Sequence, residues 1–214
     1  YVTDSIKKES IDSSNRIFKV IEVDSNNPST WEGYEQGNWW IQDYSAYQAI
    51  DITFQIYKNL YNSANITVLD MCAAPGGKTF VALQKGAKVF ACDISQARID
   101  RMYENLFRLK FTKNQIFVRN IDLSEKSISQ KDIGKFIDRC NITDQKFIEN
   151  QLFDIVILDA PCTSSGLIRK HPDIRWLINE QSLSKNTYIQ SLLLKEVDKY
   201  LRDGGIVLYA VCSV

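Results

Sequence analysis

The chain has a single histidine, His171, among its 214 residues, and its five cysteines include no C-x-x-C pair. These absences exclude the common zinc-binding patterns and leave no obvious base for a serine hydrolase, so we predict no metal site. An odd set of separated cysteines is also untypical of a disulfide framework. We therefore expect a reducing, cytoplasmic location.

Neither sign of charge dominates, because 26 Lys and Arg balance 26 Asp and Glu. A chain without a basic excess lacks the electrostatic footprint of autonomous, tight nucleic-acid binding, although a local basic strip is compatible with it. No apolar run is long enough to cross a membrane, and residues 1–14 lack the apolar region of a signal peptide. We expect a monomeric globular protein with no membrane partner.

Residues 1–40 differ in composition from the rest of the chain. Residues 16–23 (RIFKVIEV) are strand-like, residues 24–30 are loop-like, and residues 31–40 hold three of the four tryptophans. This pattern predicts a strand and hairpin segment with an aromatic cluster. Stacking of nucleic-acid bases on the rings is the alternative.

From residue 41 onward, apolar strands alternate with amphipathic helices. Helical spacing of Ala46, Ile50, Phe54, Tyr57 and Leu60 predicts the first helix, and Ser95 is a predicted N-cap of a later one. Residues 124–150 read as a polar, irregular insertion with some helix. Continuous Val, Ile and Leu strands indicate a doubly wound, mostly parallel sheet covered on both faces. The predicted strands span residues 67–71, 88–93, 115–118, 153–160 and 205–211.

Acidic and thiol side chains follow the ends of all five predicted strands. In an open parallel sheet, ligands bind outside these carboxyl ends. The co-location therefore predicts an active site at this edge. The residues are Asp70, Asp93, Asp122, Asp159 with Cys162, and Cys212.

The glycine turn after the first strand, DMCAAPGGKT (residues 70–79), has three interpretations. A phosphate-binding loop is disfavoured because Cys72 replaces its first glycine and Pro75 removes a backbone N–H group. A dinucleotide fingerprint is absent, since only Gly76 and Gly77 are present. The third interpretation is a nucleoside-binding turn, and S-adenosylmethionine fits it.

In such a site Asp93 would accept hydrogen bonds from ribose hydroxyls, and Asp122 would pair with the adenine amine. The alternative for Asp93 is a simple helix N-terminal charge. Cys162 and Cys212 end adjacent strands, which lie ~5 Å apart in a sheet, so both thiols can face one substrate. The alternative is two unrelated buried cysteines.

Six segments together carry a family resemblance. Their order and spacing resemble the Sun/RsmB family of RNA cytosine-5 methyltransferases, from about residue 33 to residue 214. The segment IRKHPDIRW is similar to the bacterial branch that modifies small-subunit ribosomal RNA. The six segments are QDYS, VLDMCAAPGGKT, ACD, LDAPCTSSG, IRKHPDIRW and YAVCSV.

The resemblance implies a cofactor, a substrate and a set of residue roles. S-adenosylmethionine would be the methyl donor, and a single-stranded or looped RNA cytosine the acceptor. Cys212 would be the nucleophile, Cys162 would assist product release, and Asp159 would accept charge developing on the ring. The implied cofactor residues are Cys72, Ala73, Ala74, Pro75, Gly76, Gly77, Lys78, Asp93, Asp122 and Asp159.

The chain departs from the family pattern at three places. Val211 replaces a threonine, residues 124–150 are longer than expected, and the last two strands and an N-terminal RNA-binding domain are missing. We therefore expect a Rossmann-like class I methyltransferase fold that is truncated after strand five. Residues 41–214 would be a C-terminally incomplete catalytic domain, and residues 1–40 a remnant of an RNA-recognition region.

Two other functions remain open at this point. A non-catalytic, cofactor-binding RNA module would suit the neutral charge, and a DNA cytosine-5 methyltransferase would use Cys162 as its nucleophile. A basic segment after the thiol could meet phosphates or could be a solvated loop. Its residues are Arg169, Lys170, His171 and Arg175.

Overall fold

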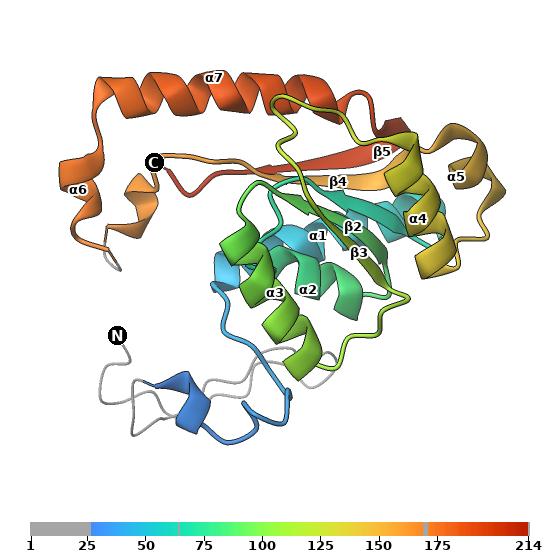
Figure 1. The fold of residues 1–214 in the computed structure, drawn as a ribbon, viewed down its shortest axis with the longest axis horizontal. Helices are drawn as coiled ribbons and strands as arrows, with labels where there is room; N and C mark the ends of the chain where they lie inside the picture. The colour runs from blue at the N-terminus through green and yellow to red at the C-terminus, as the bar shows by residue number, and fades with distance from the viewer. Residues whose placement is uncertain (1–26, 64, 169–170, 214) are drawn as a thin grey trace. The chain divides into compact units, whose positions relative to one another are not determined.

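The computed structural model describes residues 27–63, 65–168 and 171–213 (Figure 1). By compactness the chain divides into two units, residues 1–40 and 41–214. The strand-like segment 16–23 lies outside the described residues.

The described part of the first unit is built from turns and aromatic rings. A short 3-10 helix, η1 (Pro28–Thr30), is followed by successive turns, and residues 27–40 contain no strand. The expected hairpin is therefore wrong for residues 31–40, but the aromatic cluster is present. The rings of Trp31 and Trp39 stack with centroids 5.7 Å apart, and Tyr34 meets Trp39 edge-on at 5.3 Å.

The second unit is built on five strands in the order β3-β2-β1-β4-β5, and every neighbouring pair is parallel. The strand order reverses between β1 and β4, which is where doubly wound sheets bind ligands. The predicted α/β architecture is confirmed. The strands are β1 (Thr67–Asp70), β2 (Lys88–Asp93), β3 (Ile116–Asn120), β4 (Phe153–Asp159) and β5 (Leu201–Ala210).

Helices cover both faces of this sheet (Figure 1). Successive strand residues point to opposite faces, so Leu69 and Phe90 join a core cluster with α4, α5 and α7. The helices α1, α2 and α3 lie on the other face. The helices are α1 (Tyr44–Tyr61), α2 (Gly77–Gln84), α3 (Gln96–Arg108), α4 (Gln130–Cys140), α5 (Gln145–Asn150), α6 (Ile174–Leu177) and α7 (Glu180–Val197), with the 3-10 helix η2 (Ser165–Leu167).

Residues 124–150 form part of the core, so the expectation of an irregular insertion is wrong. Two helices occupy most of this stretch, and Ile133, Phe136 and Phe147 are buried. The ring of Phe136 lies 5.5 Å from that of Phe90 on β2. On each of the two helices the buried apolar residues lie on one face, so a segment that is polar on average still contributes to the core.

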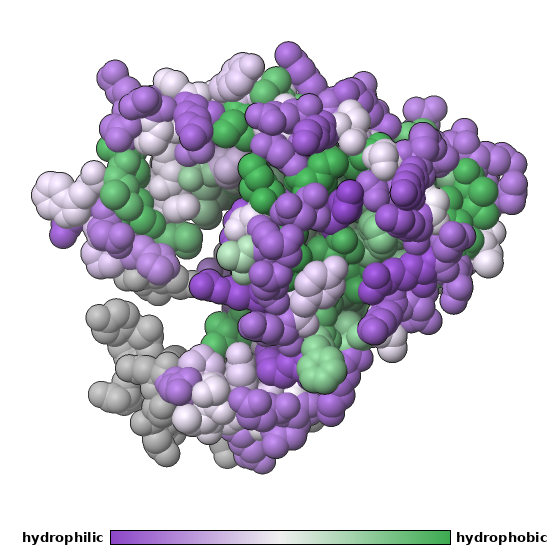
Figure 2. Space-filling model, viewed as in Figure 1, coloured by the Kyte–Doolittle hydropathy of each residue, from purple (hydrophilic) through white to green (hydrophobic). Residues whose placement is uncertain are grey.

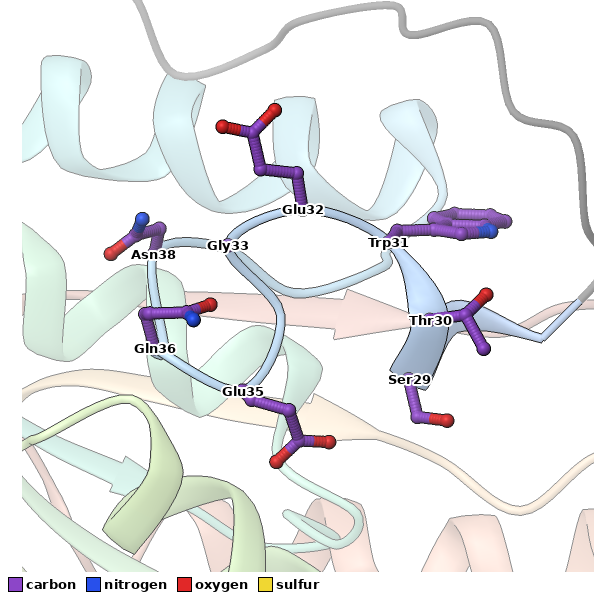
Figure 3. A pocket seen from close by; sticks show the side chains of 8 residues that line it. All are labelled: Ser29, Thr30, Trp31, Glu32, Gly33, Glu35, Gln36 and Asn38. Atoms are coloured by element: carbon purple, nitrogen blue, oxygen red, sulfur yellow. The ribbon is translucent and has the colours of Figure 1, made fainter.

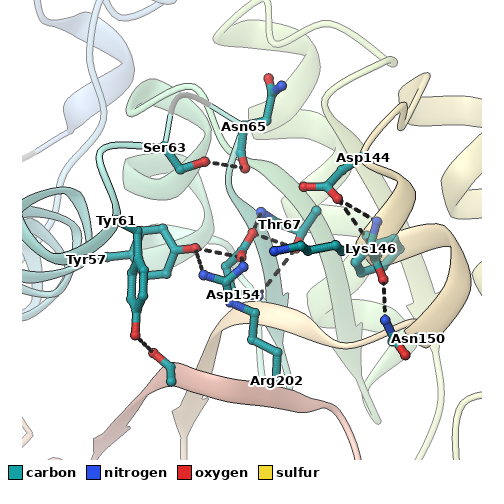
Figure 4. Close-up of polar contacts among 12 residues, drawn as sticks. Tyr57, Tyr61, Ser63, Asn65, Thr67, Asp144, Lys146, Asn150, Asp154 and Arg202 are labelled. Atoms are coloured by element: carbon teal, nitrogen blue, oxygen red, sulfur yellow. Dashed lines mark hydrogen bonds and ion pairs between the residues drawn. The ribbon is translucent and has the colours of Figure 1, made fainter.

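A polar cluster fastens α1 to the sheet (Figure 4). The Tyr57 hydroxyl donates to Asp154 Oδ1 at 2.6 Å, and the Thr67 backbone N–H donates to Asp154 Oδ2 at 2.7 Å. Arg202 forms an ion pair with the same carboxylate at 2.8 Å. Tyr57 is buried as predicted, whereas Leu60, expected on the same face, is 62% exposed.

Candidate active site

The turn between β1 and α2 is held by hydrogen bonds from its backbone N–H groups to β2. The Ala73 N–H donates to the carbonyl of Cys92 at 2.8 Å, and the Ala74 N–H donates to Asp93 Oδ2 at 3.0 Å. Gly76 has φ 113°, and a Cβ there would lie 2.3 Å from the ring of Phe80. Only glycine fits this position, which is why the turn carries one.

A cavity of about 200 Å³ opens beside this turn. Its lining includes most of the predicted cofactor residues, but Gly76, Asp93 and Asp122 are not among them. The residues that line it are Gln42, Asp43, Ala46, Asp70, Cys72, Ala73, Ala74, Pro75, Gly77, Lys78 and Asp159.

The electrostatics of the cavity disfavour a phosphate group. Two N–H groups of the turn already have protein acceptors, and Pro75 has none to offer. Lys78 Nζ lies 2.5 Å from Asp159 Oδ2. Because this ammonium has a carboxylate partner and a second carboxylate, Asp70, also lines the cavity, the turn is unsuited to act as a phosphate-binding loop.

Asp93 and Asp122 bind groups of the protein. Asp93 is 2% exposed, and its carboxylate accepts from the N–H groups of Ala74 and Ser95 and from the guanidinium of Arg98 at 2.8 Å. Asp122 Oδ1 accepts from the N–H and hydroxyl of Ser124. Asp93 therefore orders the glycine turn directly, because it holds Ala74 in place.

Asp70 is a site residue to which the sequence interpretation gave no role. It is fully buried, its Oδ2 accepts from the Thr79 hydroxyl at 2.6 Å, and Oδ1 has no hydrogen-bond partner among the described residues. Burial raises the pKa of Asp70 to about 7; the Thr79 hydrogen bond opposes this shift and nearby Asp159 reinforces it. A carboxylate at the end of β1, directly before a glycine turn, was the available signal.

Gln42 and Asp43 are further lining residues that sequence reasoning did not assign. They belong to the QDYS segment, which precedes α1. A Cβ placed on Gly77 would lie 3.5 Å from Gln42 Nε2, so the segment packs against the start of α2. The QDYS segment is recognisable in the sequence, but its contact with the glycine turn depends on how α1 packs in the folded domain.

The two predicted thiols are in direct contact. Cys162 Sγ lies 2.9 Å from Cys212 Sγ, and the Cys212 backbone N–H points at Cys162 Sγ at 3.3 Å. The hydroxyls of Thr163 and Ser213 are 2.9 Å apart, and the Gly166 N–H donates to the carbonyl of Cys212 at 2.9 Å. These contacts join the segments that follow β4 and β5.

Burial and hydrogen bonds act on the pKa values of both thiols. Burial raises the pKa of Cys162, but hydrogen bonds from Cys212, Ser213 and nearby backbone groups outweigh it and bring the pKa below its ordinary value. Burial and the hydrogen bond with Cys162 raise the pKa of Cys212, against an opposing hydrogen bond with Ser164. The hydrogen bond between the two thiols therefore acts in opposite directions on their pKa values.

The basic segment after the thiols is described only in part, because Arg169 and Lys170 lie outside the described residues. His171 and Arg175 are exposed. The Arg175 guanidinium lies 5.3 Å from the ring centre of Trp176, whose side chain is 79% exposed. Figure 2 shows apolar surface where α6 meets α7, and Leu177 and Leu183 are more than half exposed there.

A second hollow lies within the first unit, between Ser29 and Asn38. Figure 3 shows that the side chains of Glu32, Glu35 and Asn38 point away from one another, so they do not converge on a ligand. Among the described residues, no group of three His, Cys, Asp or Glu side chains is arranged to hold a metal ion. No helix in the described part of the chain is long and apolar enough to span a membrane.

Comparison with known proteins identifies the family. The family model described as 16S rRNA methyltransferase RsmB/F matches residues 58–214, which is more than half of the chain. The chain belongs to the RsmB/F family. The ribosomal RNA small subunit methyltransferase B of Cronobacter sakazakii is 36% identical over 199 residues, covering 91% of this chain and 40% of that protein. The chain thus spans about two fifths of the length of this curated RsmB/F relative.

Solved structures agree with the predicted fold. The crystal structure of PH0851 has a TM-score of 0.69 and 28% identity, covering 89% of this chain and 38% of that one. NSun6 from Pyrococcus horikoshii, crystallised with SFG, has a TM-score of 0.64 and 22% identity, covering 88% and 41%. The chain has the expected Rossmann-like fold of class I methyltransferases.

Proposed function

We propose that the chain is the catalytic part of an enzyme that transfers a methyl group from S-adenosylmethionine to carbon 5 of a cytosine in ribosomal RNA. The observation that carries this proposal is the thiol pair: Cys162 and Cys212 lie 2.9 Å apart at the ends of β4 and β5. The enzyme would act as a cytoplasmic monomer without a metal ion, on single-stranded or looped RNA.

The cavity beside the glycine turn suits S-adenosylmethionine. The ligand carries a carboxylate together with a positively charged ammonium and sulfonium, and the cavity offers Lys78 beside Asp159 and the orphan oxygen of Asp70. Residues 72–78 would hold the ligand, with Asp93 ordering their backbone and Asp122 near the adenine. When bound, S-adenosylmethionine supplies an electrophilic methyl group.

The thiols would compensate for the low nucleophilicity of carbon 5 of cytosine. Carbon 5 of cytosine is a weak nucleophile, and a thiolate that bonds to carbon 6 makes carbon 5 electron-rich enough to take a methyl group. Cys212 is the proposed nucleophile, and Cys162 lies close enough to receive the Cys212 proton. Cys162, after passing that proton to solvent, would then take the proton from carbon 5. The carbon–sulfur bond breaks, the carbon 5–carbon 6 double bond is restored, and Cys212 leaves as a thiolate.

Asp159 lies between the cavity and the thiols. It lines the cavity, and it is the last residue of β4, from which the chain continues to Cys162. Once protonated, the Asp159 carboxyl would donate a hydrogen bond to ring nitrogen 3 and so stabilise the negative charge that develops on the cytosine when the thiolate adds to carbon 6. The target base must leave its stack to reach these groups, which favours unpaired RNA.

Trapping with RNA that contains 5-fluorocytidine tests the proposal. Fluorine cannot leave carbon 5 as a proton does, so the wild-type protein should form a stable covalent adduct when S-adenosylmethionine is present. Cys212→Ala should abolish the adduct, and Cys162→Ala should retain it and accumulate adduct on ordinary RNA. Cys140→Ala is the control, since Cys140 lies on α4, away from the site. Absence of any adduct, with cofactor binding intact, would favour a non-catalytic RNA module.

One observation favours a second candidate, a DNA cytosine-5 methyltransferase that attacks with Cys162. Cys162 Sγ accepts the backbone N–H of Cys212 at 3.3 Å, a contact that favours the thiolate form of Cys162. Peptide mass spectrometry of the adduct separates the two functions. A cytosine bonded to Cys162, formed faster on DNA than on RNA, would replace the proposed function with this one.

A further inference from the structure

Ser164 has an unusual backbone conformation next to the thiols. Its φ of 58° and ψ of 23° lie in the left-handed region, which residues other than glycine and asparagine rarely adopt. Backbone strain of this kind is retained where the surrounding structure requires it, often at functional sites. The conformation therefore raises the question of what the Ser164 side chain contacts.

The Ser164 hydroxyl does not cap the helix that it precedes. Ser164 is the N-cap residue of η2, a position where serine usually accepts a hydrogen bond from the helix backbone, but its side chain makes no such bond. Instead its Oγ lies 3.2 Å from Cys212 Sγ and 3.9 Å from Cys162 Sγ. The hydroxyl thus faces both thiols.

The loop that carries Ser164 is fixed to the strand end that carries Cys212. The Gly166 N–H donates to the carbonyl of Cys212 at 2.9 Å, and the Leu167 N–H donates to the carbonyl of Ser164 at 2.8 Å. The distance between the hydroxyl and the Cys212 thiol is therefore set by the backbone on both sides.

A hydroxyl can serve both protonation states of a thiol. It accepts the S–H of neutral Cys212 and, after rotation, donates its own proton to the thiolate. The second hydrogen bond is charge-assisted and therefore the stronger of the two. We propose that Ser164 is a positioning residue that orients Cys212 and stabilises its thiolate. The contribution of Ser164 to catalysis rests on the proposed function, whereas its effect on the ionisation of the Cys212 thiol does not.

Several groups around Cys212 disfavour its thiolate, and a hydrogen-bond donor next to it opposes them. Burial, the hydrogen bond with Cys162, and the negative charges of Cys162 and Asp159 all raise the pKa of Cys212, whereas the Ser164 hydrogen bond lowers it. Among the groups that act on Cys212, Ser164 is the neutral donor that offsets two potential anions.

Site-resolved alkylation measures the effect without RNA or cofactor. The rate at which iodoacetamide labels Cys212 is followed by peptide mass spectrometry between pH 6 and 10, in the folded chain. For Ser164→Ala we expect the Cys212 profile to move to higher pH by about one unit, which is a roughly tenfold slower labelling near neutral pH. Ser191→Ala is the matched control, because that hydroxyl contacts only its own helix on α7.

Ser164→Gly separates the hydroxyl from the backbone. Glycine adopts a φ of 58° without strain, so this variant keeps the loop geometry while it removes the whole side chain, including the hydroxyl. We expect it to shift the Cys212 profile as Ser164→Ala does, and the shift should persist in a Cys162→Ala background. A wild-type profile for Ser164→Gly, or for both variants, would overturn the proposal. Failure of RNA trapping with these shifts present would overturn the proposed function alone.

Discussion

Lys78 and Asp159 form an ion pair across the proposed cofactor cavity, with Nζ 2.5 Å from Oδ2, although the two residues are 81 positions apart in sequence. Lys78 lies in the first turn of α2, and Asp159 is the last residue of β4. The pair therefore joins the glycine turn to the strand that leads to Cys162. A change at either residue affects both sides of the site.

The first prediction concerns Lys78. S-adenosylmethionine should raise the melting temperature of the wild-type chain by mass action, and ATP with magnesium should not. Lys78→Met should weaken cofactor binding about tenfold or more, because a charge-assisted hydrogen bond contributes ~1.5–3 kcal/mol. Calorimetric titration measures this, with Lys135→Met on α4 as a surface control. Stabilisation by ATP with magnesium would instead support the interpretation of residues 70–79 as a phosphate-binding loop.

The second prediction concerns Asp93. Its replacement by alanine removes the acceptor for Ala74, Ser95 and Arg98, and leaves the buried N–H of Ala74 without a partner. Asp93→Ala should therefore lower the free energy of unfolding by roughly 2–4 kcal/mol and also weaken cofactor binding. Denaturant titration and calorimetry measure the two effects. Asp122→Ala should destabilise less, since Asp122 is only partly buried; equal destabilisation would contradict the role given to Asp93.

The third prediction concerns pH and Asp70. An unfolded aspartate ionises near pH 4, whereas folded Asp70 keeps its proton up to about pH 7. Between these values the folded state binds more protons, so the free energy of unfolding should decrease as the pH rises from 4 to 7, by at most about 4 kcal/mol.

Asp70→Asn keeps the shape of the side chain and should remove this part of the pH dependence. Urea titrations of both proteins across pH 4–8 give the difference directly. Asp100→Asn on the exposed face of α3 is the matched control and should follow the wild type. Parallel curves for the wild type and Asp70→Asn would show that Asp70 ionises normally.

The fourth prediction concerns Trp176 and rests on the proposed RNA substrate. An exposed indole beside an arginine can stack on an unpaired base, which contributes ~1–3 kcal/mol per base. Trp176→Ala should therefore weaken binding of a single-stranded RNA by about fivefold or more. Fluorescence anisotropy measures the affinity. Phe107→Ala, at an equally exposed aromatic on α3, should bind like the wild type; equal losses would point to non-specific surface effects.

Much of the fold was predictable because its signals are local. Apolar strand runs, the Ser95 cap and the glycine turn each depend on a few neighbouring residues. The core role of Phe136 and Phe147 was missed because their helices look polar on average. The exposure of Leu60 depends on how α1 docks, which is a long-range property.

Some residues of the candidate site were predictable from the sequence, and others were not. The strand ends placed Cys162 and Cys212 together, since parallel strands end at one edge. Asp70 was placed at the active-site edge but given no role, because the missing hydrogen-bond partner of its Oδ1 is visible only in three dimensions. Ser164 was not singled out because its contact with Cys212 depends on a left-handed turn, which no sequence pattern here indicates.

The cluster that fastens α1 to the sheet also has a consequence for the order of folding. Tyr57 contacts Asp154 across 97 residues, and the Tyr61 hydroxyl donates to the carbonyl of Gly204 across 143 residues. During synthesis α1 leaves the ribosome well before either partner exists. The hydrogen bonds of Tyr57 and Tyr61 can therefore form only after β4 and β5 have been synthesised, and they couple the first helix of the domain to its last described strand.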